Sequence, residues 1–389
     1  MRILFVADGR SPIALNWMAY FVEQGHEVHL ASTFPAHPDL KLASLEVVPT
    51  AFSGLKASDT SNGVKRGKGR LSGVVWGGAM VRLRTALRQW LGPLTLPGAA
   101  LRLQGVIDHV QPDLVHAMRI PYEGMIAALA DPAMPLLVSV WGNDFTLHAP
   151  SNPLMGRYTR LALQRAHALH TDCWRDQRLA CAWGFPGARP AVVLPGGGGI
   201  QAELFFPPED LPDPRIINPR GFRAYVRNDA FFRSIPLVLQ QRPDARFVCP
   251  TMAGDPRALH WLEELGIAQS VELLPAQPRQ RMAELFRQAQ VAVSPSTHDG
   301  TPNTLLEAMA SGCFPIAGDI ESLREWITPG FNGLLVDPAD PQALAGAILQ
   351  ALDEPGLRLR AVIQNTRLIA EKADYRRVMQ TAEQFYRKL

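Results

Sequence analysis

Two carboxylates with seven residues between them, Asp299 and Glu307, bracket a short polar stretch of the chain. Acids on either side of a run of peptide N–H donors suit a ligand that has hydroxyl groups at both ends and negative charge in the middle. A nucleotide-sugar has this shape, because a diphosphate joins its ribose to its hexose. We therefore expect the stretch between the acids to border a diphosphate. Its residues are Gly300, Thr301, Pro302, Asn303 and Thr304.

The elements expected around this stretch place it at one edge of a parallel sheet. The apolar run 291–293 has the length of a buried strand, and 305–310 is typical of a helix. Asn303 or Thr304 is placed to cap that helix, with Glu307 in its first turn, where a carboxylate favours the positive end of the helix dipole. A strand, a polar loop and a helix N-terminus in this order predict an anion site at the carboxyl edge of the sheet.

Five ordered features extend this region: Asp299 and Glu307 at their spacing, the run L-L-E-A-M-A-S-G-C-F-P-I-A, Glu325 and the segment 331–336. Together they resemble the donor-site signature of family 4 retaining glycosyltransferases. That family usually has Glu at both acid positions, so Asp299 is one methylene shorter. It also usually has two glycines where this chain has Glu321 and Ser322. The resemblance implies an α/β protein of GT-B fold, with two Rossmann-like α/β/α domains facing a central cleft and a C-terminal helix that crosses back to the first domain.

A chain of 389 residues exceeds what one core normally supports, so two domains are expected. We expect an N-terminal, acceptor-side domain at 1–205, completed by a C-terminal helix at about 375–389, and a donor-side domain at 206–374. The segment 206–215 is rich in proline and acidic residues and is expected to link the two domains. Strand–helix alternation in both halves agrees with this division.

Composition is that of a globular protein, with 47% hydrophobic and 19% charged residues. The four cysteines form no C-x-x-C pair, so neither a zinc site nor a disulfide framework is indicated, and a cytoplasmic location is expected. Between Lys56 and Arg102 there are nine basic residues and one acid, Asp59. This stretch favours peripheral contact of 56–102 with the anionic inner face of a membrane. The alternative is a solvated charged helix face with a loop, and no nucleic-acid partner is expected.

The first half offers candidate acceptor-side residues at strand ends, with strands expected at 3–7, 114–116 and 136–140 and a helix at 122–129. The expected strand 3–7 is followed by a loop which, in the resembled family, lies across from the donor diphosphate and borders the acceptor. Where that family often has His-Gly-x-Asp, this chain has W-G-N-D, so Trp141 replaces the histidine. For Asp8 an ordinary loop role is an equal alternative, and for His116 a packed or capping role. The acceptor-side candidates are Asp8, Arg10, His116, Trp141 and Asp144; Gly9 is a donor-side candidate.

Glycines and arginines supply the remaining donor-side candidates. Four consecutive glycines at 196–199 predict a hinge with close approach of a ligand at Gly197. Three arginines follow the expected strand 216–217, where the resembled family has a Gly-Arg and a later Lys that reach the donor diphosphate. Arg220 is the candidate for the first cation and Arg227 for the second, with Arg223 as the alternative to either. Arginine suits this role because it grips phosphate bidentately and stays charged.

No D-x-D, the spacing with which many sugar transferases hold a divalent ion, occurs in the chain. We therefore expect fixed positive groups in place of a metal, and no cofactor. The resemblance implies an EC 2.4 enzyme that transfers a hexosyl group with retention from a nucleotide-diphosphate-sugar to a hydroxyl of a glycan, glycolipid or small molecule. Asp299, Arg220 and Arg227 are the catalytic candidates. Two alternatives stay open: a nucleotide-sugar 2-epimerase of the same fold, and a non-catalytic, nucleotide-binding subunit.

Overall fold

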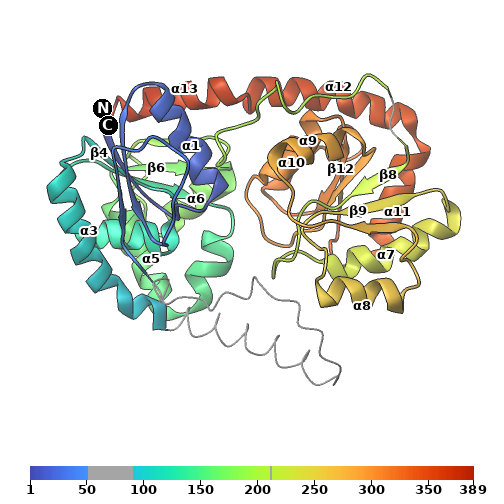
Figure 1. Ribbon diagram of the computed structural model, residues 1–389, viewed down its shortest axis with the longest axis horizontal. Helices are drawn as coiled ribbons and strands as arrows, with labels where there is room; N and C mark the ends of the chain where they lie inside the picture. The colour runs from blue at the N-terminus through green and yellow to red at the C-terminus, as the bar shows by residue number, and fades with distance from the viewer. Residues whose placement is uncertain (51–90, 211–212) are drawn as a thin grey trace. The chain divides into compact units, whose positions relative to one another are not determined.

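The computed structural model describes residues 1–50, 91–210 and 213–389. By their internal contacts they fall into two compact units (Figure 1). The first unit comprises Met1–Thr171, Asp176–Val193 and Ala382–Leu389, and the second comprises Asp172–Arg175 and Leu194–Thr381. The sequence places the domain boundary after residue 205, whereas the contacts group 194–205 with the second unit. Most of the basic stretch 56–102 lies outside the described residues, which resume at Leu91.

The first unit is built on a seven-stranded parallel sheet. Its strands are β1 (Arg2–Ala7), β2 (Glu27–Ser32), β3 (Ser44–Val47), β4 (Leu114–Ala117), β5 (Leu136–Val140), β6 (Ala168–Thr171) and β7 (Ala191–Val193). They lie in the order β3-β2-β1-β4-β5-β6-β7. Strands β2 and β3 lie on one side of β1, and β4 to β7 lie on the other. The topological switch point of the sheet is therefore between β1 and β4, and the loops after these two strands are where open α/β sheets bind ligands.

Helices pack on both faces of this sheet. Its helices are α1 (Pro12–Glu23), α3 (Leu96–Val110), α4 (Met125–Ala130), α5 (Pro153–Arg165) and α6 (Trp174–Ala182), with helical turns at Gly92–Thr95, Ile120–Gly124, Asp144–His148 and Ala149–Ser151. Successive side chains of a strand point to opposite faces. Leu4 and Val6 accordingly join the core under α3, α4 and α5, while Phe5 packs against Phe21 of α1. Both faces are buried, as expected of a parallel sheet.

The end of the last helix, α13 (Tyr375–Tyr386), completes the face that α1 covers (Figure 1). The Tyr386 ring stacks on Phe21 with centroids 4.6 Å apart, and its hydroxyl accepts a 2.8 Å hydrogen bond from Nε1 of Trp17. The same hydroxyl bonds Nδ1 of His116, whose Nε2 bonds the Ser139 hydroxyl. Residues 382–389 therefore belong to the first unit, where Ala382 and Tyr386 are buried and Tyr386 is held by a fully buried polar network.

The second unit repeats the architecture with six parallel strands. These are β8 (Arg215–Ile217), β9 (Arg246–Cys249), β10 (Val271–Leu273), β11 (Val291–Ser294), β12 (Phe314–Gly318) and β13 (Leu334–Val336), in the order β10-β9-β8-β11-β12-β13. The other helices are α7 (Asn228–Gln241), α8 (Pro256–Glu264), α9 (Arg279–Arg287), α10 (Asn303–Ala310), α11 (Pro341–Asp353) and α12 (Pro355–Lys372), with a turn at Leu323–Glu325. One face packs on α7 and α11, the other on α9 and α10.

Two local predictions are wrong. The predicted helix over 122–129 begins only at Met125, because Tyr122 adopts φ +70° and interrupts the helical turn before it. The prediction that Asn303 or Thr304 caps the helix is also wrong, because among the described residues no side chain makes a capping hydrogen bond to α10. Pro302 is the N-cap residue and Asn303 is the first residue of the helix, which places Glu307 in the second turn. Among the described residues, no helix is both long and apolar enough to cross a lipid bilayer.

Replacing Tyr386 with Phe should lower the free energy of unfolding of the first unit by about 1–3 kcal/mol, because the change leaves the buried Trp17 and His116 nitrogens without their partner. Tyr158→Phe is the control, since the Tyr158 hydroxyl makes no hydrogen bond with the described residues. Urea unfolding followed by tryptophan fluorescence measures both variants. Equal losses in the two would show that the network contributes nothing beyond packing.

Candidate functional site

In the sheet of the second unit the topological switch point lies between β8 and β11. The loops after these two strands carry the candidate donor-binding residues. Two buried asparagines shape the first loop. Nδ2 of Asn218 donates to Oδ1 of Asn228 at 2.9 Å, and Nδ2 of Asn228 donates to the carbonyl of Gly221 at 2.8 Å. Gly221 has φ +59°, a conformation that favours glycine. Further along, Val226 bridges Ser296, so the two loops lie against each other.

Arg220 joins the two loops by a buried ion pair. Its Nη2 donates to Oδ2 of Asp299 at 2.5 Å and its Nη1 to the hydroxyl of Thr304 at 3.1 Å. The side chains of Arg220 and Asp299 are only 9% and 15% exposed. Nε of Arg220 is buried and has no hydrogen-bond partner among the described residues. An anionic ligand oxygen would satisfy it, because buried polar atoms are rarely left unpaired.

The backbone of the Asp299 loop is held on several sides. The Ser322 hydroxyl donates to the carbonyl of Asp299 at 2.7 Å, and the Thr301 hydroxyl donates to the carbonyl of Asp172 at 2.5 Å. Nε1 of Trp326 donates to the Thr301 hydroxyl at 3.0 Å. Ser322 stands where the resembled family usually has glycine, and here its side chain is fully buried and bonded. The loop is therefore rigid, which favours a preorganised site.

The segment Asp172–Arg175, grouped with the second unit, packs on this loop. Nη1 of Arg175 donates to the Ser322 hydroxyl at 3.2 Å. The carboxylate of Glu325 accepts the backbone N–H groups of Trp174 and Arg175, both at 2.9 Å. A Cβ at Gly300 would overlap the carboxylate of Asp172, so glycine is required there for the close approach. Glu325 and Gly300 thus have structural roles that their sequence positions alone did not reveal.

The other two candidate arginines lie elsewhere on the first loop. Arg227 pairs bidentately with Asp229, with both hydrogen bonds at 2.8 Å, and its backbone N–H donates to the carbonyl of Pro295. Arg223 is exposed, and no hydrogen bond or ion pair joins its side chain to another described residue. Of the three arginines, the structure thus brings Arg220 to Asp299.

Glu307 and Gly197 also lie near the start of α10. An oxygen of Glu307 is 3.6 Å from Nε of Arg279, the first residue of α9. Burial raises the pKa of Glu307 to about 7, against the opposing effect of the Arg279 charge. A Cβ at Gly197 would lie 2.5 Å from the Asn303 amide nitrogen, so the glycine run passes closely by the helix start. The structure therefore brings Gly197, Asn303 and Thr304 to one helix end.

In the first unit, the loop after β1 carries a salt bridge. The carboxylate of Asp8 accepts two side-chain hydrogen bonds from Arg10, both at 2.9 Å, and the Arg10 guanidinium lies 3.7 Å from the centre of the Phe34 ring. The backbone N–H of Gly9 donates to the Ser32 hydroxyl at 3.0 Å. A Cβ at Gly9 would lie 2.8 Å from that hydroxyl, so the turn accepts only glycine without movement.

The loops after β4 and β5 are joined by Asp144. Its buried carboxylate accepts from Nη2 of Arg119 at 2.7 Å and from the backbone N–H groups of Trp141 and Ile120 at 3.1 and 3.3 Å. The Arg119 guanidinium also lies 5.4 Å from the Trp141 ring. Asp144 therefore orders the loop that contains Trp141 and holds Arg119 at the carboxyl edge of the sheet.

His116 and Glu123 are both buried in the first unit. His116 belongs to the Tyr386 network described above, and burial together with the nearby His170 holds its pKa well below the usual range. Glu123 accepts a 2.7 Å hydrogen bond from the Thr33 hydroxyl, and burial raises its pKa to about 7. Glu123 follows the strained residue Tyr122, and Arg119 lowers its pKa while Asp8 raises it. These charged groups therefore influence one another near the carboxyl ends of β1 and β4.

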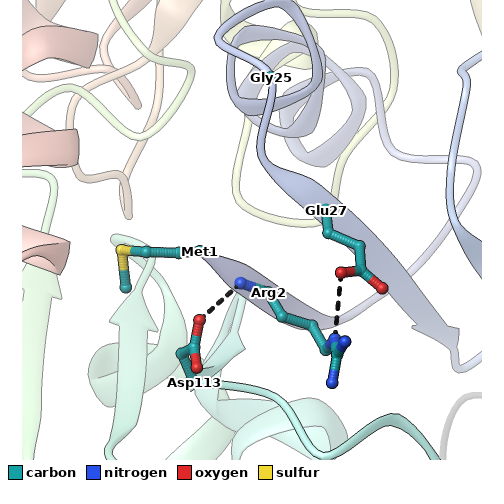
Figure 2. A pocket seen from close by; sticks show the side chains of 5 residues that line it. All are labelled: Met1, Arg2, Gly25, Glu27 and Asp113. Carbon is teal, nitrogen blue, oxygen red and sulfur yellow. Dashed lines mark hydrogen bonds and ion pairs between the residues drawn. The ribbon is translucent and has the colours of Figure 1, made fainter.

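Figure 2 shows a pocket at the opposite, amino-terminal edge of the same sheet, lined by Met1, Arg2, Gly25, Glu27 and Asp113. The backbone N–H of Arg2 donates to Asp113 at 2.7 Å, and its guanidinium pairs with Glu27 at 3.1 Å. Open parallel sheets bind ligands at the carboxyl ends of their strands. Because this pocket lies at the other end and its charged groups pair with one another, it is not the candidate site.

Sequence reasoning missed three arginines that contact candidate residues: Arg119, Arg175 and Arg279. A positional signal existed for Arg119, since it follows the expected strand 114–116 by three residues, at the sheet edge where ligands bind. Arg175 and Arg279 contact Ser322 and Glu307 across 147 and 28 residues of sequence, respectively (322 − 175 and 307 − 279). No local pattern marks contacts of that kind.

Gly300→Ala should destabilise the second unit by about 1–3 kcal/mol, because its new methyl group overlaps the Asp172 carboxylate. Gly346→Ala is the matched control: Gly346 is inside α11 and a Cβ there meets nothing within 4 Å, so alanine should stabilise the helix by up to about 1 kcal/mol. Thermal unfolding of both variants checks the pair. A melting temperature for Gly300→Ala at or above that of Gly346→Ala would contradict the close packing of this loop.

Comparison with protein families identifies both units. A model described as a glycosyl transferase 4-like domain matches residues 9–196. A second model, described as glycosyl transferases group 1, matches residues 221–354 and so includes the loops of the candidate donor site.

Curated relatives are similar over part of the chain. D-inositol 3-phosphate glycosyltransferase of Thermobispora bispora is 31% identical over 190 residues, which is 44% of each chain. The enzyme of the same name from Corynebacterium glutamicum is 27% identical over 193 residues, 44% of this chain and 45% of the relative. The matched region of this chain thus spans less than half the length of these curated relatives.

Solved structures with low sequence identity share the fold over the whole chain. Sucrose-phosphate synthase from Thermosynechococcus elongatus is 16% identical with a TM-score of 0.74, covering 100% of this chain and 99% of that one. HepE of Anabaena in complex with UDP is 14% identical with a TM-score of 0.71, covering 100% of both chains.

The two parallel α/β sheets thus have the architecture of GT-B glycosyltransferases, and this confirms the fold class expected from the sequence. The chain belongs to the group 1 family of glycosyltransferases.

Proposed function

We propose that this chain is a retaining, metal-independent glycosyltransferase that moves a sugar from a nucleoside-diphosphate-sugar to a hydroxyl group of an acceptor. The observation that carries the proposal is the position of Arg220. It lies at the switch point of the second sheet, bonded to Asp299 and Thr304 at the start of α10, with a buried Nε that lacks a described partner. A cation beside a helix N-terminus suits a diphosphate leaving group.

In this proposal the donor is held by the second unit. Arg220 and the N-terminal end of α10 bind the diphosphate, while Arg227 or Arg223 supplies the second cation. Asp299 holds hydroxyls of the transferred sugar, and Glu307 holds those of the ribose. Several complexes of structural neighbours contain UDP, including that of Anabaena HepE, and this supports a nucleotide donor and makes UDP the first to test.

The acceptor is proposed to bind at the carboxyl edge of the first unit, near Asp8, Arg10, Trp141 and Asp144. Both arginines at this edge, Arg10 and Arg119, pair with carboxylates, and hydroxyl groups can bond to such pairs. The acceptor class is a glycan, a glycolipid or a small molecule. Since relatives are named D-inositol 3-phosphate glycosyltransferases, a phosphorylated polyol belongs among the small molecules to be tested.

Arg220→Gln should lower the rate of nucleotide release from the donor about 10²–10³-fold, because it removes a fixed positive charge from the leaving group. Arg367→Gln, in an exposed ion pair on α12, is the control and should leave the rate unchanged. The assay measures release from a panel of nucleotide-sugars with the acceptor panel present. Unaltered turnover in Arg220→Gln would remove Arg220 from the mechanism.

Chelation tests the proposed metal independence, which rests on the absence of D-x-D from the sequence. With EDTA we expect the same rate as without it. One short segment offers a candidate metal site against this proposal, because ligand atoms of Asp172, Cys173 and Asp176 lie within 4.8 Å of one another. Loss of activity in EDTA that a divalent ion restores would refute metal independence. Product analysis without an acceptor distinguishes a transferase from an epimerase, which would convert the donor itself.

Peripheral membrane contact through 56–102 is a separate proposal, based on the excess of basic residues in that stretch. The described end of the stretch exposes Leu94, Leu101 and Arg102. We expect the protein to co-sediment with anionic liposomes and to be released by salt, because charge attraction is screened. Equal recovery with neutral and anionic vesicles would contradict this proposal.

A further inference from the structure

Glu307 is a mostly buried acid with one cation in reach. Its side chain is 13% exposed, and among the described residues only Arg279 lies within ion-pair distance, at 3.6 Å. Arg279 is also the charged group that lowers the pKa of Glu307 against the effect of burial. The elements that pack on α10 include α9, α12, β11 and β12, and of these α9 supplies the partner.

Arg279 is itself held in place by two further contacts. Its Nη1 donates to Oε1 of Gln201 at 3.1 Å, and its guanidinium carbon lies 5.3 Å from the centre of the Phe205 ring. Both partners belong to the segment that follows the glycine run, within the second unit. A guanidinium restrained in this way keeps its charge next to Glu307 without the entropy loss that a free side chain would incur.

We propose that Arg279 is a positioning residue of the donor site: it keeps the Glu307 carboxyl ionised and oriented so that both its oxygens accept hydroxyl groups of the donor ribose. This inference rests on the proposed function, because it assigns the ribose to Glu307. It adds a residue 28 positions from Glu307 that the sequence did not single out (307 − 279).

Burial of the Glu307 carboxyl opposes the ionised state that binding of the ribose requires. Two adjacent ribose hydroxyls are best bound by two strong acceptor oxygens, which an ionised carboxylate offers, whereas a protonated one keeps a single strong acceptor and adds an O–H donor. Burial holds the pKa of Glu307 at about 7, so near neutral pH the carboxyl is already partly protonated. Without the Arg279 charge the pKa would rise further, and binding of the ribose would need a higher pH.

The experiment compares UDP binding by calorimetry between pH 6 and 9 for the wild type, Arg279→Gln, Arg279→Lys and Arg281→Gln. Loss of the charge should raise the pKa of Glu307 further, which weakens UDP binding about fivefold at pH 7 and leaves it near wild type at pH 9. Arg279→Lys keeps the charge and should keep the wild-type pH profile. Arg281→Gln is the matched control, on the same helix but exposed and paired with Glu284.

A second ligand shows whether the effect passes through the ribose. With 2′,3′-dideoxy-UDP the hydroxyls that Glu307 would accept are missing, so wild type and Arg279→Gln should bind equally at every pH. If Arg279→Gln instead weakened both ligands by the same factor, without recovery at pH 9, Arg279 would act only on the fold and the inference would be wrong.

Glu307→Gln separates failure of this inference from failure of the proposed function. If Glu307→Gln weakens UDP but Arg279→Gln binds like Arg281→Gln, the role of Arg279 is refuted while the donor site stands. If Glu307→Gln binds UDP like wild type, or if neither UDP, GDP nor ADP binds to the wild type, the proposed donor site fails and this inference fails with it.

Discussion

The buried ion pair between Arg220 and Asp299 is the constraint on which the candidate site depends. An arginine that is 9% exposed cannot remain without a counter-charge, because an unpaired buried charge costs several kcal/mol. The loops after β8 and β11 must therefore meet, and the strand order makes them neighbours. Around them the asparagine pair and the Ser322 hydroxyl fix the backbone. The cation is thus built into the unit before any ligand arrives.

Each of the two units, considered separately, has the same kinds of charged groups at the same point of its sheet. In both, the switch point of a parallel sheet carries carboxylates paired with arginines: Asp144 with Arg119 in the first, Asp299 with Arg220 in the second. Each also has one buried glutamate whose pKa burial raises to about 7, namely Glu123 and Glu307. Neutralised charges of this kind are stable in a folded chain yet can exchange partners with a polar ligand. Such an arrangement fits the donor and acceptor of the proposed function, which carry charge and hydroxyl groups.

Whether a feature could be predicted from the sequence depends on whether the residues that form it are close together or far apart along the chain. Strands such as 291–293 and the helix after Pro302 were predictable because apolar runs and turn residues act locally. The spacing of Asp299 and Glu307 led to the donor loop for the same reason. Tyr122 was not predictable, since a positive φ is uncommon for a bulky residue and no local sequence signal marks it. The helix cap was also mispredicted: Asn303 was expected before the helix and lies within it. Arg175 and Arg279 act on partners far along the chain, and such contacts leave no pattern in one sequence.

Tyr386 has a consequence for biosynthesis. Residues 382–389 leave the ribosome after every residue of the second unit, yet two of them, Ala382 and Tyr386, are buried in the first. Until they emerge, the indole of Trp17 and Nδ1 of His116 lack the Tyr386 hydroxyl as partner, and the face of the sheet against α1 stays open. The first unit therefore cannot complete its packing until the whole second unit has been translated. A truncation near the C-terminus would for the same reason destabilise the domain that is synthesised first.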